Sequence, residues 1–338
     1  MRFRDVCVET LVYELPPVVV RTAEIERELA PLYRRMGIKP GWLETVTGIQ
    51  ERRLWDVSES APEVAARVSR RALDEAGVDP GDIGVIISAS VSREYVEPST
   101  ACMIHGALGL SPHCLNFDIV NACLGFLNGM ITVSTLIEAG HIKAGLVVSA
   151  ESSRVVLEAT LERLRRPGAG IHEYKDELAS LTLGSAAVAM VMTKRENSRT
   201  DRRFLGGTIL AATEHNDLCR GTTTRMVTDS ARLLGAGISL AEKTWPRFRE
   251  EIGWSPDNIN EYVLHQVGRA HHRNLMTSLK LPHERALEVY SGLGNIGSAG
   301  VPLTAARAAE LGRVQPGDHL ALMGIGSGLN CAMMGIEW

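Results

Sequence analysis

The sequence predicts an α/β protein built from two similar halves. Three observations indicate this: strand-like runs, helical patterns between them, and a repeat at half the chain length. Apolar runs typical of strands buried on both faces lie at Val85–Ile87, Leu146–Val148 and Val188–Met192. Between them, apolar residues follow helical spacing at Val64–Ala76 and Gly125–Ala139. This alternation is typical of a layered α/β fold.

The repeat consists of two sequence echoes in the same order. Gly77–Ile83 (GVDPGDI) is echoed by Gly253–Ile259 (GWSPDNI), and Gly140–Gly145 (GHIKAG) by Gly312–Gly317 (GRVQPG). The offsets are 176 and 172 residues, close to half of the 338-residue chain. The sequence therefore predicts a duplicated fold with an N-terminal half over residues 1–200 and a C-terminal half over residues 201–338.

Composition excludes several classes of protein. Lys and Arg number 36 against 40 Asp and Glu, a net charge of −4, which argues against binding to nucleic acid or to an anionic membrane surface. No run of 18 apolar residues occurs, and no apolar stretch of signal-peptide length follows Met1. The six cysteines are scattered and lack metal-ligand spacing. We therefore expect a cytoplasmic protein with neither a metal nor a resident cofactor.

Cys123 is the first candidate for chemistry. It lies in Asp118–Phe126 (DIVNACLGF), where a strand pattern becomes a helical one. A thiol at a helix N-terminus experiences the positive end of the helix dipole, which favours the nucleophilic thiolate. The alternative is a buried small hydrophobic residue, as most free cysteines are.

Asn295 and His265 are the next candidates. On the 172-residue offset Asn295 falls opposite Cys123, and equivalent ends of symmetric halves face a shared cleft, so we expect the two to meet there. Asn295 lies among glycines in Gly292–Gly297, and a left-handed turn residue is the alternative. His265 ends a strand pattern, where α/β proteins place site residues, and a core histidine is the alternative.

A glycine-rich segment near the C-terminus, Gly324–Gly328 (GIGSG), completes the set. Its Gly326 and Ser327 are suited to direct backbone N–H groups at a developing oxyanion. A sharp turn between two strands is the alternative.

The order Cys, His, Asn, with 142 residues between Cys123 and His265, also describes a papain-like protease. That class carries Cys-Gly-Ser/Ala-Cys-Trp/Tyr near its N-terminus. Here Asn-Ala-Cys-Leu-Gly-Phe lies a third of the way along an α/β repeat. The protease interpretation is therefore rejected.

The whole chain resembles the thiolase superfamily, and within it the β-ketoacyl synthase III branch. The motifs that support this are Thr47–Arg53, Pro98–Ala101, Asn121–Cys123, His265–Gln266, Gly294–Gly297 and Gly324–Gly328. Three segments are most similar to the group that condenses two acyl-CoA molecules head to head in olefin and β-lactone biosynthesis: Arg52–Trp55, Ser92–Thr100 and Gly326–Cys331. Degradative thiolases are disfavoured, because their second catalytic cysteine precedes the glycine loop, whereas Cys331 follows it and is interpreted as a strand residue.

The resemblance implies two βαβαβαββ halves in five α-β-α-β-α layers, and a homodimer. It assigns Cys123 as the acyl-accepting nucleophile, and His265 and Asn295 as donors that hold the second thioester and its enolate. Backbone N–H groups of Cys123 and of the Gly326–Ser327 region form the other oxyanion hole. The implied partners are acyl-CoA substrates and, as a guess from family context, downstream olefin and β-lactone enzymes.

Glu97 distinguishes between two chemistries. A decarboxylative synthase needs no base, whereas condensing two ordinary acyl-CoAs requires removal of an α-proton, a task suited to a carboxylate in an apolar pocket. In the group resembled, a glutamate of this loop enters the active site of the partner subunit, and Glu97 matches it. A solvated loop glutamate is the alternative, and the neighbouring Tyr95, Val96 and Pro98 weigh against it.

The coenzyme A site departs from the branch pattern, which has a tryptophan and, four residues later, an arginine. Trp42 is present and is expected to stack on adenine, but Val46 occupies the arginine position, so the cation that meets the phosphates is left open.

Three functions follow. The first is non-decarboxylative Claisen condensation of two long-chain acyl-CoAs into a 2-alkyl-3-oxoacyl product. The second is a decarboxylative β-ketoacyl synthase III that uses a malonyl extender. The third, from another class, is an inactive acyl-binding scaffold, against which the complete Cys, His and Asn set argues. Acyl chain length and the fate of the product are not determined by the residues.

Overall fold

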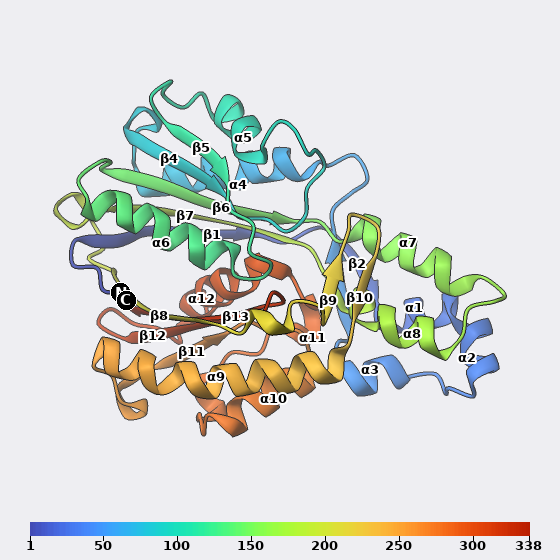
Figure 1. Ribbon diagram of the computed structural model, residues 1–338. Helices are drawn as coiled ribbons and strands as arrows, with labels where there is room; N and C mark the ends of the chain where they lie inside the picture. Colours follow the sequence, from blue (N-terminus) through green and yellow to red (C-terminus); the bar gives the residue numbers. More distant parts are fainter.

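The computed structural model describes residues 1–338, and its main feature is a nine-stranded mixed sheet that bends into two layers (Figure 1). Strands β1 and β8 join the layers through a single residue pair, Cys7 with Arg203. The first layer has the order β1 (Val6–Glu14), β7 (Ala186–Lys194), β6 (Ala144–Glu151), β4 (Ile83–Ser88) and β5 (Leu115–Asp118). The second has the order β8 (Arg203–Ala211), β13 (Asn330–Glu337), β12 (His319–Gly326) and β11 (Glu261–Leu264).

Helices cover both layers and fill the space between them, which gives five layers in all. Helices α6 and α12 lie in the middle, in a hydrophobic core that takes side chains from both sheet layers. Two further cores hold α4 and α5 on the outside of the first layer, and α9 and α10 on the outside of the second. The six helices are α4 (Ala61–Ala76), α5 (Thr100–Leu108), α6 (Gly125–Glu138), α9 (Ser230–Ile252), α10 (Arg269–Ser278) and α12 (Gly300–Glu310).

The two sequence echoes occupy equivalent places in the halves. Helices α4 and α9 end at Gly77 and Gly253, whose φ angles of 60° and 80° are left-handed, and each is followed by a 3-10 turn and then β4 or β11. Helices α6 and α12 are followed by Gly140 and Gly312, with φ of 73° and 70°. A left-handed residue closes a helix end, and glycine adopts it without strain. The predicted duplication is confirmed, whereas the division at residue 200 stays a prediction.

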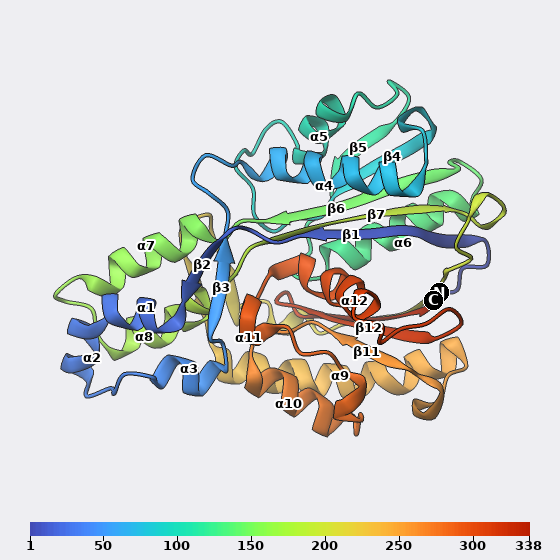
Figure 2. The same cartoon turned by 180° about the vertical axis from the view of Figure 1, so that it is seen from behind.

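A lobe beside the two layers was not foreseen from the sequence (Figures 1 and 2). It has its own hydrophobic core of 11 buried residues, built mainly from helices before and after the first half of the sheet. Two small hairpins and a short helix adjoin it. The elements are β2 (Val18–Arg21), α1 (Thr22–Glu28), α2 (Ala30–Met36), α3 (Trp42–Thr47), β3 (Glu51–Leu54), α7 (Arg154–Arg165), α8 (Ile171–Glu177), β9 (Cys219–Gly221), β10 (Met226–Thr228) and α11 (Tyr290–Leu293).

Arg52 ties this lobe to the sheets. Its guanidinium is fully buried and donates to the hydroxyl of Thr22 at 3.0 Å and to the carbonyl of Leu181 at 2.9 Å. Burial lowers the pKa of Arg52 to about 10. Leu181 belongs to a 3-10 turn, Leu178–Thr182, so Arg52 fixes a segment that borders the functional site.

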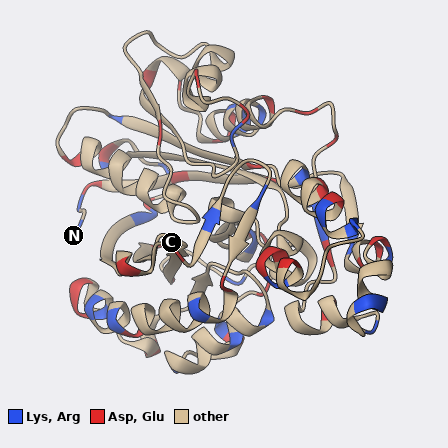
Figure 3. Ribbon diagram, turned by 45° about the vertical axis from the view of Figure 1, so that its right-hand side comes forward, with Lys and Arg blue, Asp and Glu red and all other residues tan.

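Charges of both signs are interspersed over the helices (Figure 3). None of the helices combines the length and the apolar character that crossing a bilayer requires.

Candidate active site

Cys123 lies in a tight turn between β5 and α6. Ala122 has a left-handed φ of 45°, uncommon for a residue with a side chain and typical of strained turns at functional sites. The N–H of Leu124 donates to the carbonyl of Asn121 at 2.9 Å, which closes the turn. Gly125 begins the helix, where a Cβ would lie 2.5 Å from the carbonyl oxygen of Ala89. The turn thus requires glycine, and Cys123 is held at the entrance to α6.

The thiol of Cys123 is protonated at rest, contrary to the sequence-based expectation. Burial raises its pKa to about 12, and the carboxylate of Glu151 and the thiol of Cys219 add to this. The helix dipole is a partial charge, so it does not compensate for the loss of solvation at this position. Cys219, in β9, is a neighbour that the linear sequence gave no reason to select.

His265 follows β11 directly and is buried. Its backbone N–H donates to the carbonyl of Met323 in β12 at 2.8 Å, which continues the parallel pairing of the two strands. Burial lowers the pKa of its imidazole to about 3, and the nearby His271 contributes, with ring centroids 6.2 Å apart. His265 is therefore neutral and serves as a hydrogen-bond donor rather than as an acid.

Asn295 is fixed through its backbone, which leaves its amide group available. Its N–H donates to the carbonyl of Thr182 at 2.8 Å, and its carbonyl accepts from Gly184 at 2.8 Å. The side-chain oxygen accepts from the N–H of Gly297 at 3.1 Å. With the oxygen engaged, the amide nitrogen is the free end and is oriented as a donor.

Shared contacts bring these segments together. The carbonyl of Ala89, at the end of β4, meets both the start of α6 at Gly125 and the hydroxyl of Ser298, three residues after Asn295. The position of a Cβ on Gly300 lies 3.3 Å from Nδ1 of His265 and 3.8 Å from Ile296, so the histidine and the Asn295 segment meet at the start of α12. Residues from the two halves therefore converge, as the duplication predicted.

The glycine-rich segment also lies at this place. A Cβ on Gly326 would sit 3.1 Å from the carbonyl of Asn121 and 3.2 Å from Leu124, so the segment packs on the Cys123 turn. Gly326 pairs with Asn330 across β12 and β13, which makes Ser327 part of a turn between strands. Both interpretations of the segment hold at once. Cys331 is buried in β13, the strand residue that was predicted.

Glu97 lies apart from this cluster in the single chain. It is in the exposed loop between β4 and α5, next to Val96, which is 90% exposed, and Tyr95, which is 53% exposed. This chain supplies no apolar pocket around the carboxylate, so a role as base requires a second subunit.

Trp42 begins α3, where its indole packs on Tyr174 with ring centroids 5.7 Å apart. At the other end of α3, Arg269 from the start of α10 lies against Gly48, where its Nε is 2.8 Å from the position of a Cβ. Val46 itself is 37% exposed. The fold thus brings a cation to the helix that lacks one, from 223 residues away in the sequence.

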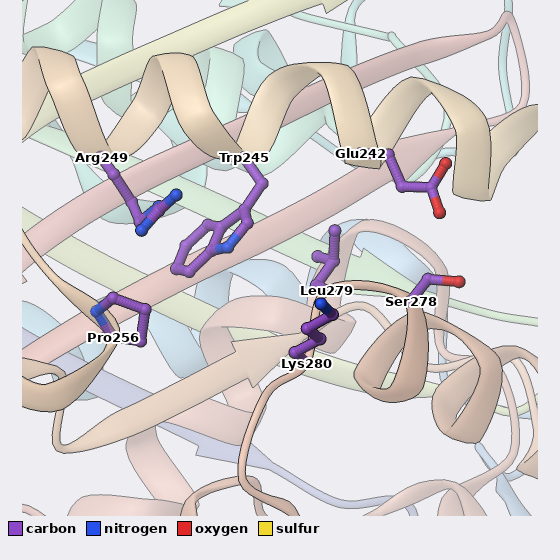
Figure 4. A pocket seen from close by; sticks show the side chains of 7 residues that line it. All are labelled: Glu242, Trp245, Arg249, Pro256, Ser278, Leu279 and Lys280. Atoms are coloured by element: carbon purple, nitrogen blue, oxygen red, sulfur yellow. The ribbon is translucent and has the colours of Figure 1, made fainter.

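A surface pocket of about 360 Å³ lies elsewhere, between α9 and α10 (Figure 4). It is lined by Trp245, Arg249, Leu279 and Lys280 among others, with the guanidinium of Arg249 5.3 Å from the Trp245 ring. None of the candidate residues contributes to it. It lies on the outer side of the second layer, away from the Cys123 turn.

Two family models match the chain. The one described as 3-oxoacyl-[acyl-carrier-protein (ACP)] synthase III covers residues 117–209, and its C-terminal counterpart covers residues 250–338. The first range includes Cys123, and the second includes His265 and Asn295.

Curated relatives match along the full length. The acyl-CoA:acyl-CoA alkyltransferase of Xanthomonas campestris pv. campestris is 43% identical over 338 residues, which covers 100% of both chains. The chain belongs to this alkyltransferase family. The enzyme of the same name from Shewanella oneidensis is 38% identical, again over 100% of both chains. A β-ketoacyl-[acyl-carrier-protein] synthase III of Rhizorhabdus wittichii is more distant, at 27% identity over 91% of this chain and 94% of its own.

Solved structures agree. OleA of Xanthomonas campestris with bound cerulenin superposes with a TM-score of 0.98 at 43% identity, over 100% of this chain and 98% of that chain. Another structure of that enzyme holds lauric acid and lauroyl-CoA and superposes with a TM-score of 0.97 at 42% identity, over 99% of this chain and 100% of that chain. Further OleA structures carry substitutions at a cysteine, a histidine or a glutamate. The predicted resemblance and thiolase-like fold are confirmed.

Proposed function

We propose that the protein is an acyltransferase that joins two long-chain acyl-CoA molecules by non-decarboxylative Claisen condensation, with a 2-alkyl-3-oxoacyl product. The observation that carries this proposal is the convergence of Cys123, a neutral His265 and the free amide of Asn295 where the two halves meet. Membership of the alkyltransferase family, and a relative with bound lauroyl-CoA, support the substrate class.

In the first step Cys123 accepts an acyl group. Its sulfur bonds to the thioester carbon, the bond from that carbon to the sulfur of coenzyme A breaks, and the thiol proton leaves with coenzyme A. Backbone N–H groups of Cys123 and of the Gly326–Ser327 turn, which packs on it, stabilise the oxyanion. A thiol with a pKa of about 12 gives up its proton only as the new bond forms, so no resting thiolate is needed.

In the second step a base removes an α-proton from the second thioester. His265 and the amide of Asn295 donate to the carbonyl oxygen, where the negative charge of the enolate develops. A neutral imidazole suits this role, because it donates without transferring its proton. The carbanion then attacks the acyl group on Cys123, the carbon–sulfur bond breaks, and the departing sulfur regains its proton from the protonated base.

We assign the base to Glu97 of a second subunit. Its own chain leaves it exposed beside Tyr95 and Val96, a position suited to insertion into a neighbouring molecule. The family relatives include an OleA structure with a substituted glutamate, which agrees in residue type. The proposal therefore requires a homodimer in which each site is completed by its partner.

For coenzyme A we propose that Trp42 contacts the adenine and that Arg269 meets a phosphate. The two residues lie at opposite ends of α3, and Arg269 takes part in no ion pair. A pathway role beside olefin or β-lactone enzymes, and a cytoplasmic location, are part of the same proposal.

The decarboxylative synthase remains the second candidate, and the relative with that activity is only 27% identical. It would not need Glu97. An inactive scaffold would not need Cys123, His265 and Asn295 together.

The deciding experiment gives the purified protein only a long-chain acyl-CoA and follows coenzyme A release and products by mass spectrometry. We expect a β-keto acid or ketone that holds both chains. Glu97→Gln should load one acyl group per site yet lose condensation by at least about 100-fold, while Glu94→Gln, on the same loop, should keep it. Full condensation by Glu97→Gln would overturn the base assignment, and carbon dioxide release from a malonyl-carrier protein would favour the second candidate.

A further inference from the structure

Glu151, the last residue of β6, is a buried carboxylate with five hydrogen-bond donors. One oxygen, Oε1, accepts from the N–H of Val91 at 2.9 Å and from Ser298, through its N–H at 3.1 Å and its hydroxyl at 3.0 Å. The other oxygen, Oε2, accepts from Ser92, through its N–H at 3.0 Å and its hydroxyl at 2.8 Å. The carboxylate is 4% exposed in total, so these donors replace water.

No cation neutralises this charge. The neighbouring Arg154 directs its guanidinium to the carbonyl of Trp55 and to Glu158. Other buried glutamates of the protein are paired with arginine, such as Glu9 with Arg199 at 2.9 Å. A buried carboxylate without a counter-ion depends on its donors, so the donor groups are held in position around it.

The donors come from two segments that the proposed chemistry uses. Val91 and Ser92 begin the loop that leads to Glu97, in the N-terminal half. Ser298 lies in the 3-10 turn between Asn295 and α12, in the C-terminal half. Gly297 has a left-handed φ of 56°, and a Cβ there would lie 2.8 Å from Oε1, so the second segment approaches the carboxylate as closely as a backbone allows.

We propose that Glu151 is a positioning residue that fixes the Glu97 loop and the Asn295 segment relative to each other through these five hydrogen bonds. The inference rests on the proposed function for the roles of Glu97 and Asn295. One carboxylate then sets the start of the loop that one protomer sends to its partner and the donor that its own site retains. Loss of the carboxylate releases both segments at once, because each is bound to it and neither replaces the other's donors.

The same charge also acts on the nucleophile. Glu151 is the second cause, after burial, of the raised pKa of Cys123, and Cys219 is the third. Removing the negative charge should therefore shift the pH dependence of Cys123 acylation to lower pH. A residue that only held the fold together would not produce this shift.

The test compares Glu151→Gln with the wild-type protein. An amide places an N–H₂ group opposite N–H donors, so at least one segment loses its bonds. We expect amide hydrogen exchange to rise in residues 91–99 and in residues 293–300 together, condensation per loaded site to fall at least about tenfold, and acylation to persist with its pH profile moved down. Glu9→Gln, which removes a buried carboxylate of β1, should leave both segments protected.

Two milder variants address the case in which Glu151→Gln fails to fold. Ser92→Ala and Ser298→Ala each remove one hydroxyl donor, from opposite segments. If Glu151 couples the segments, their effects on condensation are non-additive in the double variant and the coupling disappears when residue 151 is glutamine. Additive effects, or increased exchange in only one of the two segments, would overturn the inference. Absence of any condensation product from the wild-type protein would instead refute the proposed function, and the exchange experiment would still decide the role of Glu151.

Discussion

The imidazole Nδ1 of His265 lies 3.3 Å from the point at which a side chain on Gly300 would begin, at the first residue of α12. This nitrogen is buried and has no hydrogen-bond partner in the protein. The positive end of the α12 dipole disfavours a proton there. The proton of the neutral ring is therefore placed on Nε2, the nitrogen that the proposed mechanism uses as a donor.

Replacing Gly300 by alanine tests this arrangement. The methyl group would press on His265 and displace Nε2 from the enolate, so we expect condensation to fall about tenfold to 100-fold while Cys123 still loads an acyl group. Gly235→Ala is the matched control, because Gly235 lies within a helix and its Cβ would meet open space. Equal losses of loading and condensation would argue against the assignment.

The buried histidines should make stability depend on pH. Burial lowers the pKa of His265 to about 3 and that of His271 to about 4, both below their ordinary value of 6.5. The unfolded chain binds these protons first, so the free energy of unfolding should fall as the pH drops below about 6.5, by up to about 1.4 kcal/mol per pH unit for each histidine, down to about pH 4. Urea denaturation between pH 4.5 and pH 7 measures this slope. The slope should be smaller for His271→Leu, and an unchanged slope would contradict the prediction.

The raised pKa of Cys123 predicts slow alkylation at rest. Its reaction with iodoacetamide should keep accelerating beyond pH 9, because the thiolate fraction still increases there. Cys102 is exposed and serves as the internal reference in the same peptide mass spectrum. A plateau for Cys123 near pH 7 would mean that the thiolate is already formed, as the position before α6 alone would suggest.

Arg269 is predicted to bind the nucleotide end of the substrate. Arg269→Ala should raise the KM for acyl-CoA about tenfold, the value of one charge-assisted contact, and leave kcat unchanged. An acyl-pantetheine, which lacks the nucleotide, should show no such increase. Arg247→Ala, on the exposed side of α9, is the control. A similar rise with both substrates would place Arg269 outside the coenzyme A site.

The lobe around α1, α2, α7 and α8 was not predicted because its pieces are far apart in the chain. Its helices are short, and each buries its apolar face only against the others. Periodicity reports that a face is apolar but not which segment covers it. For the same reason Arg52, quoted in a motif, could not be recognised as a buried donor to Leu181.

The sequence by itself determined the duplicated α/β fold and the three residues that converge, Cys123, His265 and Asn295. Strand and helix periodicity, glycines at helix ends and the spacing of the echoes are local properties, and duplication then places equivalent ends face to face. Only the tertiary structure decided the charge states of Cys123 and His265 and the partners of Glu151. Desolvation and hydrogen bonding depend on every segment packed around a group, and those segments come from opposite ends of the chain.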